Sequence, residues 1–220
     1  MFTHTPSRHC EAEGRSKPYN GLPRRSLREL LAMTAKVDGL KIIAVTGPMA
    51  AGKNYICNQL KEEGWAAVDA DILVHDAIEL VKDKILKTFI PYAETQNIKL
   101  THPDGSIDRH ALGSLLFSFP ELLAIQESIV YPIITKQIEN FIDGHDKTII
   151  NATVLYKTPE LLARCEKIIF VTAPFFTRLS RARRRDHLPL RQIIRRFHAQ
   201  RNLLKEYQKF TIPIEVIINK

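Results

Sequence analysis

The chain has 220 residues, of which 45% are hydrophobic and 25% are charged, an ordinary composition for one globular domain. The longest apolar stretches, such as residues 168–176, are less than half of the roughly 20 residues that a membrane-spanning helix needs, which excludes a membrane span. The net charge of +8 is local, because residues 178–209 contain eleven Lys or Arg and only two Asp or Glu. Such a segment predicts a polyanionic ligand, either a nucleic acid or a nucleotide polyphosphate.

Residues 1–39 are interpreted as an N-terminal extension, with disorder up to about Pro23 and a short helix where Ser26 and Glu29 have capping-box spacing. The segment has no apolar region of a secretory signal. Two explanations stay open, a genuine extension or a start codon assigned too early, with Met33 as the initiator.

The cysteines indicate a reducing compartment. Cys10, Cys57 and Cys165 are odd in number, widely spaced and contain no Cys-x-x-Cys pair. Neither a disulfide framework nor a thiolate metal cluster can be drawn from them, so we expect free thiols in a cytoplasm.

From Lys41 onward, short β-branched runs alternate with helical stretches, which predicts an α/β fold with a parallel sheet covered on both faces. Nearly eighty residues separate the second and third strands, so we expect an inserted helical subdomain at about residues 80–145. Within it, Asp108 is placed to cap a helix over residues 109–117, and Pro120 opens a longer helix that stops near Gly144. The expected strands are residues 41–46, 65–69, 148–154, 167–172 and 214–218.

A phosphate-binding loop is predicted directly after the first strand. Residues 47–53 fit the pattern Gly-x-x-x-x-Gly-Lys, and residues 55–63 after it are compatible with a helix. The glycines allow successive backbone amides to turn toward phosphate oxygens, and Lys53 would reach the β- and γ-phosphates of ATP. The alternative is a plain strand-to-helix turn with a surface lysine. The expected ATP-binding residues are Gly47, Ala50, Ala51, Gly52, Lys53, Asn54 and Tyr55.

Oxygen ligands for Mg²⁺ are expected from Asn54 and Asp71. Asn54 stands where the Ser or Thr ligand of Mg²⁺ is usual, but an amide oxygen can also bind a hard cation, directly or through water. Asp69 and Asp71 lie two residues apart at the end of the second strand, so both carboxylates could face the ligand crevice and deprotonate a hydroxyl or hold metal. Alternatively, Asp71 is only the N-cap of a helix that begins at Ile72.

The basic segment predicts a lid. Arg178, Arg181 and Arg185 share one helical face, and residues 186–189 break that helix before a second one. Two arginine-bearing helices at about residues 181–200 could close over a triphosphate and neutralise charge on a transferred phosphoryl group. The alternative, a solvated basic face, is favoured for Arg183, Arg184 and Arg191.

These motifs occur in an order that resembles bacterial dephospho-CoA kinase, a P-loop kinase of the last step of coenzyme A synthesis. The resemblance covers about residues 40–219. Its landmarks are the loop 47–54, the pair Asp69 and Asp71, the run 103–109 with Leu112 and Phe117, the lid residues Arg181, Arg185, Asp186, Arg196 and Gln200, and the terminal 216–219.

The resemblance implies transfer of the ATP γ-phosphoryl group to the 3′-hydroxyl of dephospho-CoA by a cytoplasmic enzyme. It implies a five-stranded parallel sheet, a helical acceptor-binding subdomain and a helical lid. Asp71 matches the base, Lys53 the phosphate-binding lysine and Arg185 the lid arginine. The acceptor would be bound by Asp69, Arg109 and Tyr131.

The chain departs from the family pattern around the acceptor. The usual His-Pro reads Tyr131-Pro132, and residues 151–157 read Asn-Ala-Thr-Val-Leu-Tyr-Lys in place of Asp-x-Pro-Leu-Leu-Phe-Glu. Two alternatives therefore remain beside the leading hypothesis. One is another P-loop kinase of a nucleotide or small molecule, and the other is a degenerate nucleotide-binding or nucleic-acid-binding protein that uses the arginine segment.

Overall fold

A computed structural model describes residues 41–220, with the side chains of residues 117 and 120 left aside. The extension, its capping box, Met33 and Cys10 lie outside the described residues. The strands are β1 Lys41–Thr46, β2 Ala66–Asp69, β3 Lys147–Asn151, β4 Lys167–Thr172 and β5 Ile214–Ile218. The helices are α2 Lys53–Glu62, α3 Ala70–Leu80, α4 Lys82–Glu94, α5 Arg109–Ser118, α6 Pro120–Asp143, the 3₁₀ turn η1 Leu155–Lys157, α7 Pro159–Ala163, α8 Phe175–Asp186, α9 Leu190–Ala199 and α10 Leu203–Tyr207.

The five strands form one parallel sheet in the order β2-β3-β1-β4-β5. This confirms the predicted α/β class and five-stranded parallel sheet. In the register, Asn151 at the end of β3 lies between Val45 of β1 and Asp69 of β2. The carboxyl ends of these strands therefore meet at one edge, where open α/β sheets bind ligands.

Alternate residues along the strands supply two separate cores. Ile43 and Val45 of β1 pack in the cluster that contains Ile56 and Leu60 of α2. Ile42 and Ala44 belong to the opposite cluster, which extends into the inserted helices. Successive strand side chains point to opposite faces, so these strands are buried on both sides and read as continuous apolar runs.

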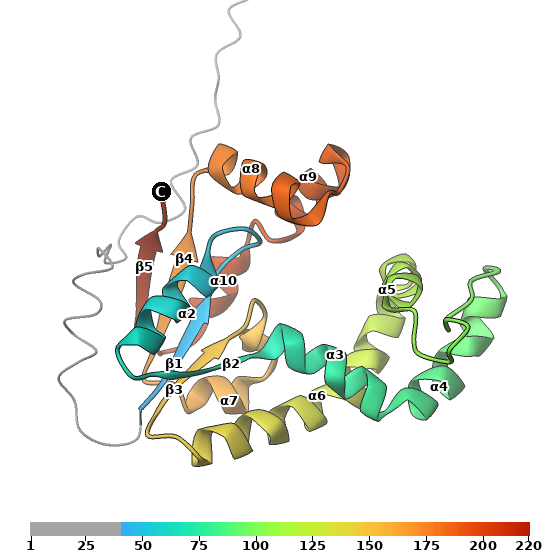
Figure 1. Ribbon diagram of the computed structural model, residues 1–220, viewed down its shortest axis with the longest axis horizontal. Coiled ribbons are helices and arrows are strands. Elements are labelled where there is room, and N and C mark those ends of the chain that lie inside the picture. Colours follow the sequence, from blue (N-terminus) through green and yellow to red (C-terminus); the bar gives the residue numbers. More distant parts are fainter. Residues whose placement is uncertain (1–40) are drawn as a thin grey trace, which may run out of the picture.

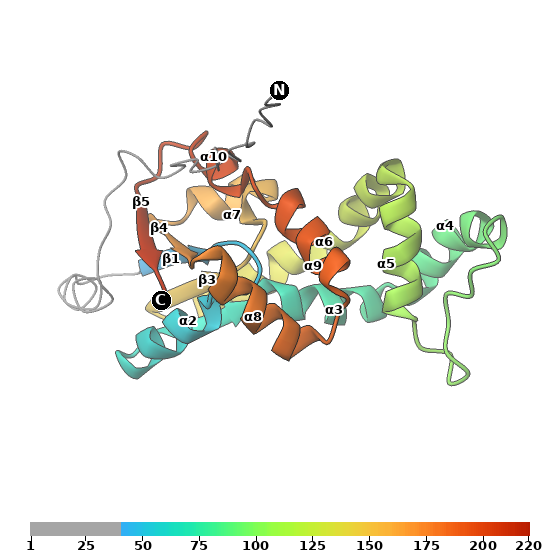
Figure 2. The ribbon, with the colours of Figure 1, turned by 90° about the horizontal axis from the view of Figure 1, so that it is seen from above.

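The segment between β2 and β3 is mostly helical. Helices α3, α4, α5 and α6 extend from the sheet to one side of the molecule, while α8 and α9 lie over the end of the sheet that carries the loop after β1 (Figure 1, Figure 2). Phe89, Leu115 and Leu122, from three of the inserted helices, are fully buried and share a core that continues beneath the sheet. No helix within residues 41–220 is both long and apolar enough to cross a membrane.

The third strand ends at Asn151, three residues before the position expected from sequence. Its successor Ala152 still donates its backbone N–H to Val45, but the carbonyl oxygen of Thr153 accepts hydrogen bonds from the side chains of Thr46 and Tyr207. These long-range donors replace a neighbouring strand, so the chain leaves the sheet here and enters η1.

Candidate active site

The loop between β1 and α2 can be built only with glycine at two positions. Gly47 has φ +145°, and a Cβ there would lie 2.0 Å from the carbonyl oxygen of Val171. Gly52 has φ +97°, and its Cβ would lie 1.9 Å from the side-chain nitrogen of Asn219. Both backbone conformations are strained for other residues, so the tight approach of the loop to β4 and β5 explains the Gly-x-x-x-x-Gly spacing.

Side chains from α8 and the end of β5 hold the carbonyl oxygens of this loop. Arg178 Nε donates to the Met49 oxygen at 2.9 Å. The Ala51 oxygen accepts from Asn219 Nδ2 at 3.1 Å and from Arg181 Nη1 at 3.4 Å. With these carbonyl oxygens satisfied by polar donors, the loop and the start of α2 are suited to present amide groups to a phosphate.

The second helix of the predicted lid also contacts the loop. Gln200, directly after α9, accepts the backbone N–H of Met49 at 2.7 Å. The guanidinium of Arg178 stacks 4.1 Å from the ring centre of Phe197 and so ties α8 to α9. The family resemblance contained Gln200 and Asn219 as landmarks without a role, and only the folded chain brings them to the phosphate loop.

Lys53 begins α2, two residues before the helical run read from sequence. Its Nζ donates to the carbonyl oxygen of Gly47 at 3.1 Å, so the side chain lies back across the loop. Burial lowers the pKa of Lys53, while the negative charges of Asp71 and Asp69 oppose that change. The loop, the lysine and both carboxylates therefore share one electrostatic site.

Asp69, rather than Asp71, caps α3. One Asp69 carboxylate oxygen accepts the N–H of Asp71 at 2.9 Å and that of Ile72 at 3.4 Å, and the helix begins at Ala70. The alternative that Asp71 caps a helix starting at Ile72 is wrong, because the earlier aspartate already supplies the capping oxygen. Asp71 stands in the first turn as an exposed residue, and the protein around it still desolvates its carboxylate in part.

The environment of Asp71 suits a proton acceptor. Desolvation by the surrounding protein raises the pKa of Asp71, the nearby charge of Asp69 raises it further, and the charge of Lys53 opposes both effects. A carboxylate with a raised pKa binds a proton more strongly than an ordinary aspartate and remains ionised above that pKa.

Asn54 and Asn151 meet in the same region. Asn151 Nδ2 donates to Asn54 Oδ1 at 2.9 Å and to the second carboxylate oxygen of Asp69 at 2.8 Å. Sequence reasoning noticed Asn151 only as a departure from the family pattern. Its closeness to Asn54, 97 positions earlier, follows from the pairing of β3 with β1.

The residues present fit a magnesium ion that arrives with a nucleotide. Asn54 and Asp71 both expose hard oxygen atoms, and Asn54 Oδ1 keeps a second lone pair beside its bond from Asn151. Mg²⁺ usually takes one or two protein oxygens and completes its shell with phosphate and water. A preformed cage of three or more His, Cys, Asp or Glu side chains is not found within residues 41–220.

Arg185 lies at the end of α8 and is engaged by its neighbour. Its Nε and Nη2 donate to the two carboxylate oxygens of Asp186, at 2.7 Å and 3.1 Å. This hydrogen bonding raises the pKa of Arg185, and the charge of Asp71 also acts on the guanidinium. The arginine thus lies within electrostatic reach of the predicted base.

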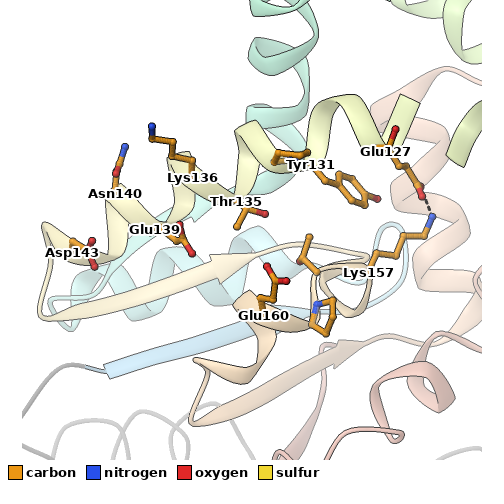
Figure 3. Close-up of a pocket in the computed structure, with 13 residues that line it drawn as sticks. Glu127, Tyr131, Thr135, Lys136, Glu139, Asn140, Asp143, Lys157 and Glu160 are labelled. Carbon is orange, nitrogen blue, oxygen red and sulfur yellow. Dashed lines mark hydrogen bonds and ion pairs between the residues drawn. The ribbon is translucent and has the colours of Figure 1, made fainter. Parts of the chain in front are cut away.

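Tyr131 lines a cavity between α6 and the η1–α7 segment. The cavity has a volume of about 920 Å³ and is lined by Glu127, Tyr131, Glu139, Lys157 and Glu160 among others (Figure 3). The Tyr131 ring points toward the ion pair that Lys157 forms with Glu127 (Figure 3). Burial raises the pKa of Tyr131, and the neighbouring Glu127 carboxylate raises it further, so the phenol stays protonated.

Arg109 does not bind the residues of the site around Lys53 and Asp71. It lies exposed at the start of α5, after the Asp108 cap, whose carboxylate accepts the N–H groups of His110 and Ala111 at 2.9 Å each. In the described part of the chain, no hydrogen bond or ion pair joins Arg109 to Lys53 or Asp71.

The described cysteines are not nucleophiles. Cys57 and Cys165 are free and buried, and burial raises the pKa of each thiol to about 12. Both therefore remain protonated near neutral pH.

Comparison with known proteins identifies the family. The sequence model of the dephospho-CoA kinase family matches residues 41–218. A Treponema denticola dephospho-CoA kinase is 34% identical over 185 residues, 81% of each chain, and a Danio rerio dephospho-CoA kinase domain-containing protein is 31% identical over 72% of this chain and 70% of its own.

Solved structures agree on the fold. The Thermus thermophilus protein TT1252 superposes with a TM-score of 0.69 at 23% identity, covering 83% of this chain and 90% of its own. Dephospho-CoA kinase from Campylobacter jejuni gives 0.51 at 22% identity, covering 82% and 88%. The chain therefore belongs to the dephospho-CoA kinase family and is an ATP-dependent kinase, as the order of its motifs predicts.

Proposed function

We propose that this enzyme transfers the γ-phosphoryl group of ATP to the ribose 3′-hydroxyl of dephospho-CoA, with Asp71 as the general base. The observation that carries the assignment is geometric: Lys53 lies back across the phosphate loop, and its neighbour Asn54 is joined through Asn151 and Asp69 to the turn that carries Asp71. A phosphate-binding cation and a proton acceptor are the two groups that such a transfer needs.

The triphosphate is bound by the loop and the start of α2. The amide groups of Ala50 and Gly52 and of the first turn, including Asn54 and Tyr55, lie where helix and loop dipoles favour an anion. The N–H of Ala51 donates to the Pro48 oxygen at 3.2 Å and would exchange that bond for a phosphate oxygen. Lys53 exchanges the carbonyl oxygen of Gly47 for oxygens of the β- and γ-phosphates. Since that bond is internal to the loop, the exchange needs only a side-chain rotation.

Asp71 accepts the proton of the 3′-hydroxyl as its oxygen attacks the γ-phosphorus. The new O3′–P bond forms while the bond from phosphorus to the β–γ bridging oxygen breaks, and ADP leaves with the electron pair of that bond. Desolvation raises the pKa of Asp71, so it holds the accepted proton more firmly than an ordinary aspartate, and the charge of Lys53 opposes that rise.

Arg185 stabilises the transferred group. Its present partner, Asp186, follows it directly on α8, and its side chain is more than half exposed. A phosphoryl oxygen can replace one of the two Asp186 bonds when the lid approaches the crevice, which would place a fixed cation against the charge that spreads over the equatorial oxygens.

Mg²⁺ would be held by Asn54 and Asp71 together with ATP, and it would neutralise charge on the β- and γ-phosphates.

The acceptor side is assigned to Asp69, Arg109 and Tyr131. Asp69 acts chiefly by holding the first turn of α3, since both of its oxygens already accept hydrogen bonds. Tyr131 offers a protonated phenol in the lining of the cavity.

Release of ADP from MgATP by the purified chain, with and without dephospho-CoA, tests the proposal. We expect turnover that depends on dephospho-CoA and stoichiometric formation of coenzyme A by mass spectrometry. A panel of adenosine, other nucleosides, pantetheine and dephospho-CoA covers the acceptor region, where Tyr131 and Lys157 depart from the family pattern. Efficient phosphorylation of another member, with dephospho-CoA inert, would overturn the assignment.

A further inference from the structure

Asn151 joins the starts of two helices that carry the proposed catalytic groups. It is the last residue of β3, has only 4% of its surface exposed, and donates through one amide nitrogen to Asn54 on α2 and to Asp69 before α3. Asn54 directly follows Lys53, and Asp69 caps the turn that contains Asp71.

The hydrogen bonds fix the orientation of this amide. Both neighbours present oxygen atoms, at 2.9 Å and 2.8 Å, so the nitrogen must face them, because the reversed amide would set oxygen against the Asp69 carboxylate. The Oδ1 atom of Asn151 is buried and finds no partner among the described residues. A buried oxygen without a partner costs stability. Within the described residues, the side chain of Asn151 is therefore engaged through its amide nitrogen, which binds Asn54 and Asp69.

The contacts continue from Asn151 to the proposed base. The Asp69 oxygen that does not bind Asn151 accepts the backbone N–H of Asp71. A shift of Asn151 would consequently move Asp69, the first turn of α3 and the carboxylate of Asp71. On the other side, the bond to Asn54 holds the first turn of α2, on which Lys53 stands.

We propose that Asn151 is a positioning residue that sets the separation of Lys53 and Asp71 through Asn54 and Asp69. The inference rests on the proposed function. It also unites two departures from the family pattern, since the amide at 54 and the amide at 151 are bonded to each other. A carboxylate at 151 would face the acceptor-only carboxylate of Asp69, so toward Asp69 the position requires a donor.

A double-mutant cycle tests the proposal. Asn151→Asp keeps the shape but replaces the donor by an acceptor, and we expect kcat to fall more than tenfold while the KM for ATP changes less than threefold. The double variant Asp69→Asn with Asn151→Asp has the net charge of the wild-type chain. The amide introduced at position 69 can donate to the carboxylate introduced at position 151, and its oxygen can still cap α3. We expect this double variant to recover kcat to within a few-fold of Asp69→Asn alone.

Asn202→Asp is the matched control, because Asn202 lies exposed before α10 and makes no capping bond, so the added charge should leave kcat unchanged. Unchanged kcat in Asn151→Asp, or additive losses in the double variant, would overturn the proposal. If Asn151→Asp does not fold, Asn151→Ala removes both bonds without adding charge, and normal kcat in it has the same meaning.

The thermal midpoint is measured for the same set of variants. Failure of the wild-type chain to phosphorylate dephospho-CoA would count against the proposed function. Recovery of the thermal midpoint in the double variant would still support the hydrogen-bonded link, and its absence would count against Asn151.

Discussion

Lys157, at the end of η1, forms an ion pair with Glu127 of α6, and both residues line the cavity beside Tyr131 (Figure 3). The family pattern has an acid at position 157, and an acid there would face Glu127 directly. The lysine therefore matches its neighbour on α6, and the Tyr131 hydroxyl, which points to the same pair, completes the group. Two residues that differ from the family pattern, Tyr131 and Lys157, therefore both lie next to the Glu127 carboxylate.

Replacing Lys157 by Glu should destabilise the fold, because two carboxylates would then face each other where side chains are less than one-third exposed. We expect the free energy of unfolding to fall by about 2 kcal/mol, between the values typical of exposed and buried pairs. The reversed pair, Lys157→Glu with Glu127→Lys, should recover at least half of that loss in urea denaturation. Arg164→Glu, at an exposed pair with Asp143, is the control and should cost less than about 1 kcal/mol.

Asp71→Asn should lower kcat by about 10²–10⁴-fold, because the amide cannot accept the proton of the attacking hydroxyl. Asp76→Asn on the same helix removes an equally exposed carboxylate away from the first turn and should leave kcat within twofold. Steady-state ADP release measures both variants. Near-normal turnover of Asp71→Asn would remove that residue from the mechanism.

The pH profile of kcat/KM should show an acid limb set by Asp71. Desolvation raises the pKa of Asp71, so activity is lost as pH falls through a value above that of an ordinary aspartate, about 3.9. Asp69 also raises this pKa, and Asp69→Asn keeps a capping oxygen, so the limb should move to lower pH in that variant. A limb that stays in place would show that another group controls it.

Gly47→Ala should abolish ADP binding and lower the thermal midpoint, because its Cβ would lie 2.0 Å from a backbone oxygen of β4. Backbone cannot move aside as a flexible side chain can, so the loop must distort. Gly113→Ala is the matched control in α5, where an added Cβ meets nothing within 4 Å. In a helix interior, that change should stabilise by about 0.5–1 kcal/mol. Differential scanning fluorimetry with and without ADP checks both variants.

Local sequence patterns predicted what depends on neighbours along the chain. The bounds of β1, β4 and β5 follow their β-branched runs, and Asp108 caps α5 as its spacing indicated. The predicted end of β3 at residue 154 was wrong, because the side chains of Thr46 and Tyr207, which are distant in sequence, donate hydrogen bonds to the Thr153 oxygen.

The candidate site was also predicted only in part: the phosphate loop was predicted, but the cap of α3 and the contacts of Asn151 were not. The spacing of glycines and lysine in the loop is a local pattern that requires a tight turn, so the roles of Gly47 and Lys53 could be predicted from the sequence. The sequence offered Asp71 as an alternative N-cap, which is wrong, because the Asp69 carboxylate caps α3. Asn151 acts through partners 82 and 97 positions away, a distance that a single sequence does not bridge without strand order.

The most direct test of the central claim is ³¹P NMR of the reaction of wild-type chain, MgATP and dephospho-CoA. If the chain phosphorylates dephospho-CoA, ADP signals and one new phosphomonoester resonance grow at equal rates, with the phosphomonoester on the ribose 3′-oxygen. ADP signals that grow with free phosphate alone, or a spectrum that does not change, would contradict that claim.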